Sequence, residues 1–141
     1  MKAKTVSWSE VDNMIDRLAL IIKEANYSPT MIAAIPRGGW TVAALLAQRL
    51  NVRDSVAVTQ KKNDGNRETF VAAPRSLVGE HVLVVEDSIE TGKSLELAAS
   101  MIKEFGAEVK TTALLISPTS SSFIPNFYLD RMTIPDFPWD L

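Results

Sequence analysis

The sequence predicts an α/β domain in which a mainly parallel, twisted sheet is flanked by helices. Short apolar runs alternate with stretches that repeat apolar residues at helical spacing. This alternation favours parallel pairing, because each helix carries the chain back across the sheet. Two turns rich in polar and glycine residues, 36–39 and 86–94, each follow an apolar run. Since ligands bind at the carboxyl ends of parallel strands, we expect both turns to face one cleft.

Composition limits the class of protein. The 141 residues predict one domain over 1–141, and 46% hydrophobic and 23% charged residues are ordinary for a globular chain. A formal net charge of −2 argues against binding to nucleic acid or to a membrane surface. The chain has no cysteine and one histidine, His81, which excludes disulfides, thiolate metal sites and a multi-histidine centre within one chain. No long apolar run opens the chain, so we expect a cytoplasmic protein without a signal peptide or a membrane span.

The first third of the chain predicts a helix, a strand, a turn and a second helix. Their expected bounds are 8–26, 31–35, 36–39 and 40–50. Ser7 and Glu10 have the spacing of a capping box at the start of the first helix. Apolar residues then recur on one face from Val11 to Ile22, so this helix should pack on the sheet.

The rest of the chain continues the alternation. It predicts a helix at 93–105 and strands at 55–59, 70–73, 82–85, 109–116 and 127–129. Residues 60–69 are the most polar stretch, and we expect an exposed, mobile loop there. Gly106 suits the residue that follows the end of the helix. The last residues, 134–141, hold two prolines and two aromatic side chains, so we expect them to lie against the body of the domain.

Residues 82–95 combine an apolar strand, an acid pair and a helix start. Glu86 and Asp87 end the strand, and the loop Thr91-Gly92-Lys93-Ser94 opens the helix. The carboxylates suit hydroxyl groups or a hard cation such as Mg²⁺, and free N–H groups at the helix start suit a phosphate. A Walker A loop is excluded, because it requires a glycine where Asp87 stands. The stretch therefore predicts a site for a sugar phosphate.

The same stretch resembles the phosphoribosyl pyrophosphate (PRPP) binding motif of the type I phosphoribosyltransferases. In that family a strand ends in two acids, and the following loop closes with Thr-Gly-x-Thr or Thr-Gly-x-Ser. Pro36-Arg37-Gly38-Gly39 resembles the family's pyrophosphate loop. Within the family the chain is most similar to short purine enzymes of the xanthine-guanine and hypoxanthine type, through Asn66-Arg67-Glu68 and the ending Pro138-Trp139-Asp140.

The resemblance implies an activity and a set of partners. The family fold adds a small C-terminal hood-like region to the sheet. The reaction would move the 5-phosphoribosyl group from PRPP to a nucleobase of the purine class, with Mg²⁺, and release pyrophosphate and a nucleoside monophosphate. A homodimer is implied as well, in which Trp40 is either a contact or part of the core.

The resemblance also implies roles for individual residues. Glu86 and Asp87 would hold the ribose hydroxyls, directly or through Mg²⁺, and Glu90 is a candidate for proton transfer at the base. The 5′-phosphate would bind Thr91, Gly92, Lys93 and Ser94. Pyrophosphate would contact Arg37 and Gly38. Three cations of the polar loop would either close over the pyrophosphate or remain solvated, namely Lys61, Lys62 and Arg67.

The residues at the positions where the family binds the nucleobase depart from the family pattern. The purine enzymes usually carry a lysine after the strand 109–116, where Ser117 stands, and a stacking aromatic where Ile134 stands. With Asp136, these residues are our candidates for base binding, while Phe137 and Trp139 offer either a stacking face or core packing. The accepted base stays open. So do a non-purine acceptor and a PRPP- or nucleotide-binding regulatory domain without transferase activity.

Overall fold

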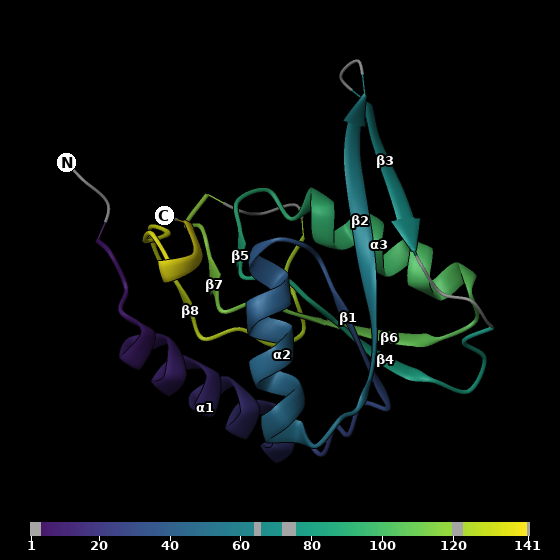
Figure 1. Cartoon of the computed structure of the whole chain (residues 1–141), viewed down its shortest axis with the longest axis horizontal. Coiled ribbons are helices and arrows are strands. Elements are labelled where there is room, and N and C mark those ends of the chain that lie inside the picture. Colours follow the sequence, from purple (N-terminus) through teal and green to yellow (C-terminus); the bar gives the residue numbers. More distant parts are fainter. Residues whose placement is uncertain (1–3, 64–65, 72–75, 120–122, 141) are drawn as a thin grey trace.

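The computed structural model describes residues 4–63, 66–71, 76–119 and 123–140, with side chains except at 60–63 and 66–71. Its helices are α1 (Trp8–Glu24), α2 (Gly38–Leu50), α3 (Lys93–Glu104) and a final 3₁₀ turn, η1 (Pro138–Asp140) (Figure 1). Its strands are β1 (Met31–Ala34), β2 (Asp54–Asn63), β3 (Asn66–Val71), β4 (His81–Val85), β5 (Ser88–Ile89), β6 (Glu108–Thr112), β7 (Leu115–Ile116) and β8 (Asp130–Arg131).

The main sheet has the strand order β3-β2-β1-β4-β6. β1 pairs in parallel with β2 and β4, and β4 pairs in parallel with β6, whereas β2 and β3 are antiparallel. The predicted α/β fold with a mainly parallel sheet is confirmed. Because Ala34 of β1 lies opposite Val85 of β4, the turns that follow these two strands begin side by side.

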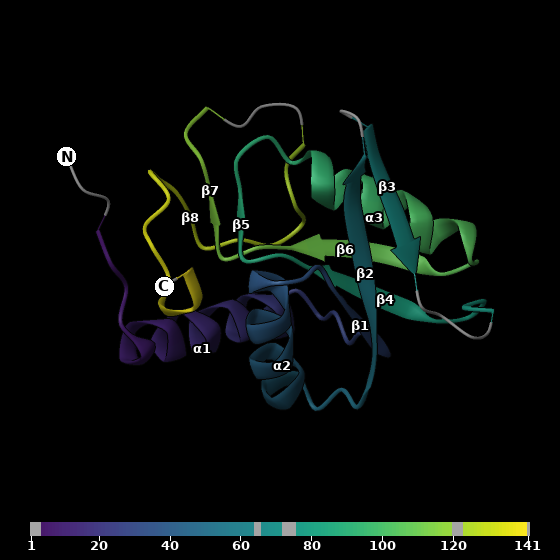
Figure 2. The same cartoon turned by 45° about the horizontal axis from the view of Figure 1, so that its top comes forward.

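Helices cover both faces of the sheet, as Figure 2 shows. Successive strand residues point to opposite faces, so neighbours in sequence enter different cores. Ile32 and Leu83 pack in the core shared with α1 and α2, and Ala33 and Val84 pack in the core shared with α3. The central strands are therefore mainly apolar: all four residues of β1 are buried, and so are residues 82–85 of β4.

The polar stretch 60–69 differs from the prediction. We expected a loop, but β2 continues to Asn63 and β3 begins at Asn66, with Lys62 opposite Arg67 in the register. The two strands extend as a ribbon beyond the rest of the sheet (Figure 1). An antiparallel ribbon satisfies its backbone hydrogen bonds within itself, so polar side chains do not prevent it. The strand expected at 70–73 is the end of β3 up to Val71, and residues 72–73 lie outside the described part.

The single strand predicted over 109–116 is also wrong. β6 ends at Thr112 and β7 begins at Leu115, because the chain changes partners between them. Ala113 N donates to Phe127 O at 3.2 Å, and Leu114 N donates to Asp87 O at 3.0 Å. β7 then joins a small parallel sheet with the order β5-β7-β8. The strand expected at 127–129 is replaced by an isolated bridge at Phe127 and by β8. The break lies at the start of the apolar run 113–116, and nothing in that run reveals it.

The ends of the helices follow local signals. The Ser7 Oγ accepts a hydrogen bond from Glu10 N at 3.1 Å, which confirms the predicted N-cap of α1. α1 ends at Glu24, earlier than expected, and Asn26 adopts a left-handed φ of 56°. Gly106 follows α3 with a φ of 100°, as predicted for a residue that closes a helix. No described helix is long and apolar enough to cross a bilayer.

The C-terminal segment packs on the domain as predicted. Asp136 N donates to Lys4 O, and Val6 N donates to Asp136 O, both at 2.8 Å. Phe137 is 1% exposed. Both views place η1 beside the start of α1 and the N-terminal end of α2 (Figures 1 and 2). The tail therefore reaches the edge of the sheet where β1 and β4 end.

Candidate active site

The turns after β1 and β4 lie in direct contact. Ile35 N donates to Val85 O at 3.0 Å, which extends the parallel pairing past the end of β1. A Cβ on Gly39 would lie 2.7 Å from Val85 O, too close for any side chain. Glycine at this position therefore lets the first turn of α2 approach the acid pair. The two turns therefore lie against each other at the carboxyl ends of β1 and β4, while the expectation that they face one common cleft stays a prediction.

Gly38 makes a second close approach. A Cβ on Gly38 would overlap the Asp87 carboxylate and would lie 2.9 Å from Trp139 Nε1. Asp87, Gly38 and Trp139 thus meet at one point, although they come from three separate parts of the chain. The peptide bond between Pro36 and Arg37, just before this contact, is cis.

Both oxygens of the Asp87 carboxylate accept hydrogen bonds from the protein. Oδ1 accepts from Ser88 N at 2.7 Å, and Oδ2 accepts from Trp139 Nε1 at 2.8 Å. Burial raises the pKa of Asp87 above its ordinary value, the two donors oppose that rise, and the charge of Asp140 adds to it. Each oxygen keeps a further lone pair, so the carboxylate can still accept a hydrogen bond from a ligand.

The loop after the acid pair presents the N-terminus of α3. Gly92 is the N-cap residue, with a left-handed φ of 85°, and it has no side chain with which to cap the helix. A Cβ on Gly92 would lie 2.9 Å from Phe123 O, so the position demands glycine for space as well as for its backbone angle. Lys93 N donates to Thr91 Oγ1 at 3.3 Å. Uncapped N–H groups of a first helical turn form a site for an anion.

Glu86 of the acid pair and this loop line one open hollow of about 330 Å³, whereas Asp87 is not among its lining residues. Its walls are Glu86, Ser88, Ile89, Glu90, Thr91, Gly92, Lys93 and Ser94. Carboxylates lie at one end of the segment and backbone N–H groups at the other. This arrangement can bind a ligand that carries both hydroxyl groups and a phosphate.

Comparison with known proteins identifies the family. A model of the phosphoribosyl transferase domain matches residues 7–141. The chain belongs to this family. The predicted resemblance to type I phosphoribosyltransferases, and to the purine enzymes among them, is confirmed by the relatives described next.

Two curated relatives and two solved structures illustrate the similarity. The xanthine-guanine phosphoribosyltransferase of Idiomarina loihiensis is 30% identical over 145 residues, which cover 96% of this chain and 86% of the relative. The orotate phosphoribosyltransferase of Levilactobacillus brevis is 29% identical over 125 residues, and the match spans only 59% of its length. The purine phosphoribosyltransferase of Pyrococcus horikoshii superposes with a TM-score of 0.85 at 29% identity, covering 100% of this chain and 95% of that one. The xanthine-guanine-hypoxanthine enzyme of Helicobacter pylori, at 16% identity and a TM-score of 0.80 over 98% and 93% of the two chains, shows the shared fold alone.

The cations predicted to contact pyrophosphate lie at three elements, the N-cap of α2, β2 and β3. Arg37 is exposed at the N-cap of α2, directly before Gly38. Lys61 and Lys62 lie on β2 and Arg67 lies on β3, and their side chains are outside the described part of the structure. The structure therefore places Arg37 next to the acid pair and leaves the roles of the other three as predictions.

The residues predicted to bind the base are more scattered. Ser117 is buried after β7, and its Oγ is 3.1 Å from Thr119 Oγ1. Ile134 is half-buried and packs against the core shared with α1 and α2, and Asp136 is exposed beside the N-terminal segment. Of the alternative stacking faces, Phe137 is excluded, because it is buried and stacks on Trp139 with 4.7 Å between ring centroids.

Trp139 is the site residue whose contact the sequence did not predict. We noted its place in Pro138-Trp139-Asp140 but expected stacking on a base or core packing. An indole donor paired with an acid 52 positions earlier leaves no local signal in the sequence. The two aromatic residues of the tail, Phe137 and Trp139, are the one hint in the sequence that the tail makes contacts of its own.

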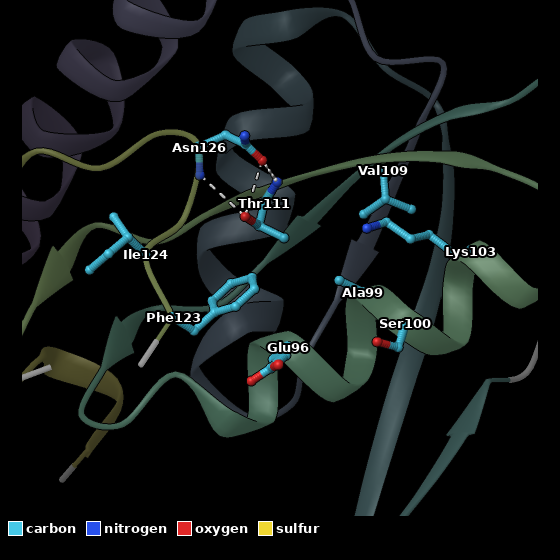
Figure 3. A pocket seen from close by; sticks show the side chains of 9 residues that line it. All are labelled: Glu96, Ala99, Ser100, Lys103, Val109, Thr111, Phe123, Ile124 and Asn126. Carbon is cyan, nitrogen blue, oxygen red and sulfur yellow. Dashed lines mark hydrogen bonds between the residues drawn. The ribbon is translucent and has the colours of Figure 1, made fainter. Parts of the chain in front are cut away.

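A second, larger hollow lies away from the acid pair. It measures about 380 Å³ between α3, β6 and residues 123–126 (Figure 3). Thr111 N donates to Asn126 Oδ1 at 2.8 Å across its floor, so these polar groups already bind each other. None of its lining residues belongs to the hollow of the acid pair. Size alone therefore does not identify the site in this fold.

Proposed function

We propose that the chain transfers the 5-phosphoribosyl group from PRPP to a nucleobase of the purine class. The observation that carries the proposal is the contact of the two turns, where Gly38 lies against the Asp87 carboxylate. The loop that begins with this acid runs directly into the uncapped N-terminus of α3. Sites for ribose hydroxyls, for a 5′-phosphate and for pyrophosphate thus adjoin one another.

The ribose would bind at the acid pair. Glu86 and Asp87 accept hydrogen bonds from the 2′ and 3′ hydroxyls, and their negative charge favours the positive charge that develops on the sugar ring during transfer. The hydrogen bonds that Asp87 receives from Ser88 and Trp139 orient its carboxylate before the substrate arrives. Preorganisation of this kind avoids a reorientation cost in the transition state.

The two phosphate groups would bind at opposite ends of the site. The 5′-phosphate accepts hydrogen bonds from the N–H groups of residues 91–94 and from the hydroxyls of Thr91 and Ser94. The pyrophosphate lies against Arg37 and the Gly38 amide, where cationic charge stabilises the departing group. Lys61, Lys62 and Arg67, on the ribbon of β2 and β3, supply further positive charge when the ribbon closes over it.

A divalent cation fits the donor set of the acid pair. Among the described residues, no three His, Cys, Asp or Glu side chains gather into a metal site. Mg²⁺, however, needs only one or two carboxylates when substrate oxygens and water complete its shell, and Glu86 and Asp87 provide these. The ion would supply positive charge to the hydroxyls and to the pyrophosphate.

The base would enter on the side of β7 and the tail. As a ring nitrogen of the base bonds to C1 of the ribose, the bond from C1 to the pyrophosphate oxygen breaks. Glu90, exposed in the hollow of the acid pair, accepts the proton that this nitrogen loses. Ser117, Ile134 and Asp136 are the proposed contacts to the base. The purine class is favoured by the Idiomarina and Pyrococcus relatives.

A panel assay tests the proposal. The protein is incubated with PRPP, Mg²⁺ and one base at a time, from hypoxanthine, guanine, xanthine, adenine, uracil and orotate, and pyrophosphate release is measured. We expect release with at least one 6-oxopurine and none with the Asp87→Ala variant. PRPP binding without release for any base would instead support a regulatory domain, and release with orotate alone would assign a pyrimidine substrate.

We also propose a homodimer that contacts Trp40. This side chain is 49% exposed directly after the pyrophosphate turn, beside a small apolar groove of about 120 Å³ between α2 and the start of β2. A large exposed aromatic beside an apolar groove is typical of an interface. Analytical sedimentation tests the proposed dimer. We expect the wild type to sediment as a dimer and Trp40→Asp as a monomer, and a monomeric wild type would contradict the proposal. The cytoplasmic location stays a prediction.

A further inference from the structure

The C-terminal turn η1 contributes a hydrogen-bond donor to the acid pair. Trp139 Nε1 donates to Asp87 Oδ2 at 2.8 Å and lies 2.9 Å from the position that a Cβ on Gly38 would take. The established family match and the site proposed above assign no role to this indole. It is nevertheless the described side chain that touches both the ribose acid and the pyrophosphate turn.

The indole is held in place from several sides. One face stacks on Phe137, with ring planes 9° apart, and its edge contacts Trp8 of α1 at a centroid distance of 6.0 Å. Asp140 Oδ2 accepts a hydrogen bond from Phe137 N at 2.8 Å, which closes η1 around the indole. Because Phe137 is buried in the core, turning the Nε1–H group away from Asp87 breaks both this hydrogen bond and the stacking contact with Phe137.

Two donors on one carboxylate determine its orientation. Ser88 N binds Oδ1 and Trp139 Nε1 binds Oδ2, so rotation of the carboxylate about its last bond breaks at least one hydrogen bond. The Ser88 amide alone leaves Oδ2 free to move. The lone pairs that remain for a ligand point in a defined direction only while the indole is in place.

We propose that Trp139 is a positioning residue for the ribose site, through which docking of the C-terminal tail completes the PRPP site. The inference rests on the proposed function, because it takes Asp87 as a ligand of the ribose hydroxyls. Trp139 itself does not touch the reacting atoms. Its role is to orient Asp87 and to hold it at the correct distance from Gly38.

The test compares Trp139→Phe with Trp8→Phe. Phenylalanine keeps an aromatic ring against Phe137 but lacks the N–H donor, whereas Trp8 is 56% exposed and contacts Asp87 only through Trp139. Calorimetry with PRPP and Mg²⁺ should show affinity weakened about tenfold for Trp139→Phe, as expected for loss of a hydrogen bond to a charged acceptor. Trp8→Phe should bind like the wild type. Thermal unfolding of both variants establishes that they are folded.

A spectroscopic measurement tests the contact without relying on turnover. The chain has three tryptophans, and each Trp→Phe variant removes one indole N–H signal from a ¹⁵N-correlation spectrum, which assigns all three. PRPP with Mg²⁺ should shift the Trp139 signal more than the Trp8 signal. Asp87→Ala should move the Trp139 signal and speed its exchange with water.

The outcomes separate the two claims. If the wild type binds no PRPP, the proposed function and this inference both fail. If the wild type and Trp139→Phe bind PRPP equally, the inference fails and the proposed function stands. If Trp139→Phe does not fold, the indole spectrum of the wild type decides: an unchanged Trp139 signal on PRPP binding overturns the inference.

Discussion

The two ends of the proposed substrate would be bound by regions of very different construction. The proposed sugar-phosphate side is one continuous loop, residues 86–94, held at the end of β4 against the turn after β1. The proposed base side consists of Ser117 after β7 and of residues of the tail, which lie far apart in sequence. A contiguous loop between a strand and a helix retains its geometry through backbone hydrogen bonds. A site made of separate segments depends on side-chain packing, and it can therefore vary without loss of the fold.

The largest effect should come from the acid pair itself. Asp87→Ala removes a ribose ligand and leaves Trp139 Nε1 without its acceptor. We expect loss of measurable PRPP binding by calorimetry while the far-UV spectrum stays native. Glu104→Ala, an exposed acid at the end of α3, is the matched control and should bind PRPP normally. Unchanged binding by Asp87→Ala would mean that the sugar does not lie at this loop.

The contact between the turns should be nearly as sensitive. In Gly38→Ala the new methyl group would overlap the Asp87 carboxylate, so the two turns must separate. A displacement of about 1 Å between groups that bind one substrate lowers kcat/KM about a hundredfold. Gly79→Ala provides a control, because that glycine has a φ of 85° with open space around it and should lose stability without losing PRPP affinity. If Gly38→Ala is as active as the wild type, the contact between the two turns is not needed for the reaction.

Substitutions in the proposed base site should change the KM for the base and leave PRPP affinity unchanged. Ile134→Ala shortens a half-buried apolar side chain and should raise KM for the base about tenfold, while PRPP affinity stays unchanged. Steady-state kinetics with each substrate varied in turn provides the measurement. If KM for PRPP rises instead, the two regions are not independent, and the comparison drawn above is wrong.

The smallest effect concerns pH. Burial raises the pKa of Asp87 in the folded state, so its protonated form is the one that the fold favours. The contribution of this group to stability is complete below the ordinary aspartate pKa of about 3.9 and is lost as pH rises through the folded-state pKa. The melting temperature of the wild type should therefore fall relative to that of Asp87→Asn across this window. A constant difference between the two would contradict the raised pKa.

The sequence predicted the parts of the fold that depend on local pattern. The strands before residues 36 and 86 were recognisable because burial on two faces makes β1 and residues 82–85 of β4 apolar. The cap at Ser7 and the turn at Gly106 were recognisable because each has a specific backbone requirement. The ribbon of β2 and β3 was not recognisable in the sequence. Its two strands form backbone hydrogen bonds with each other, so the ribbon needs no apolar face. The break between β6 and β7 was hidden inside an apolar run.

By itself, the sequence determined the parallel sheet, the acid pair, the loop at the start of α3 and the glycine turn, since each is encoded within a few consecutive residues. Only the tertiary structure decided how these parts meet. The indole of Trp139, 52 positions from Asp87, reaches its carboxylate because Phe137 is buried beside it and the first residues of the chain pair with Asp136. Contacts of that kind arise from packing between distant segments, and no local pattern records them.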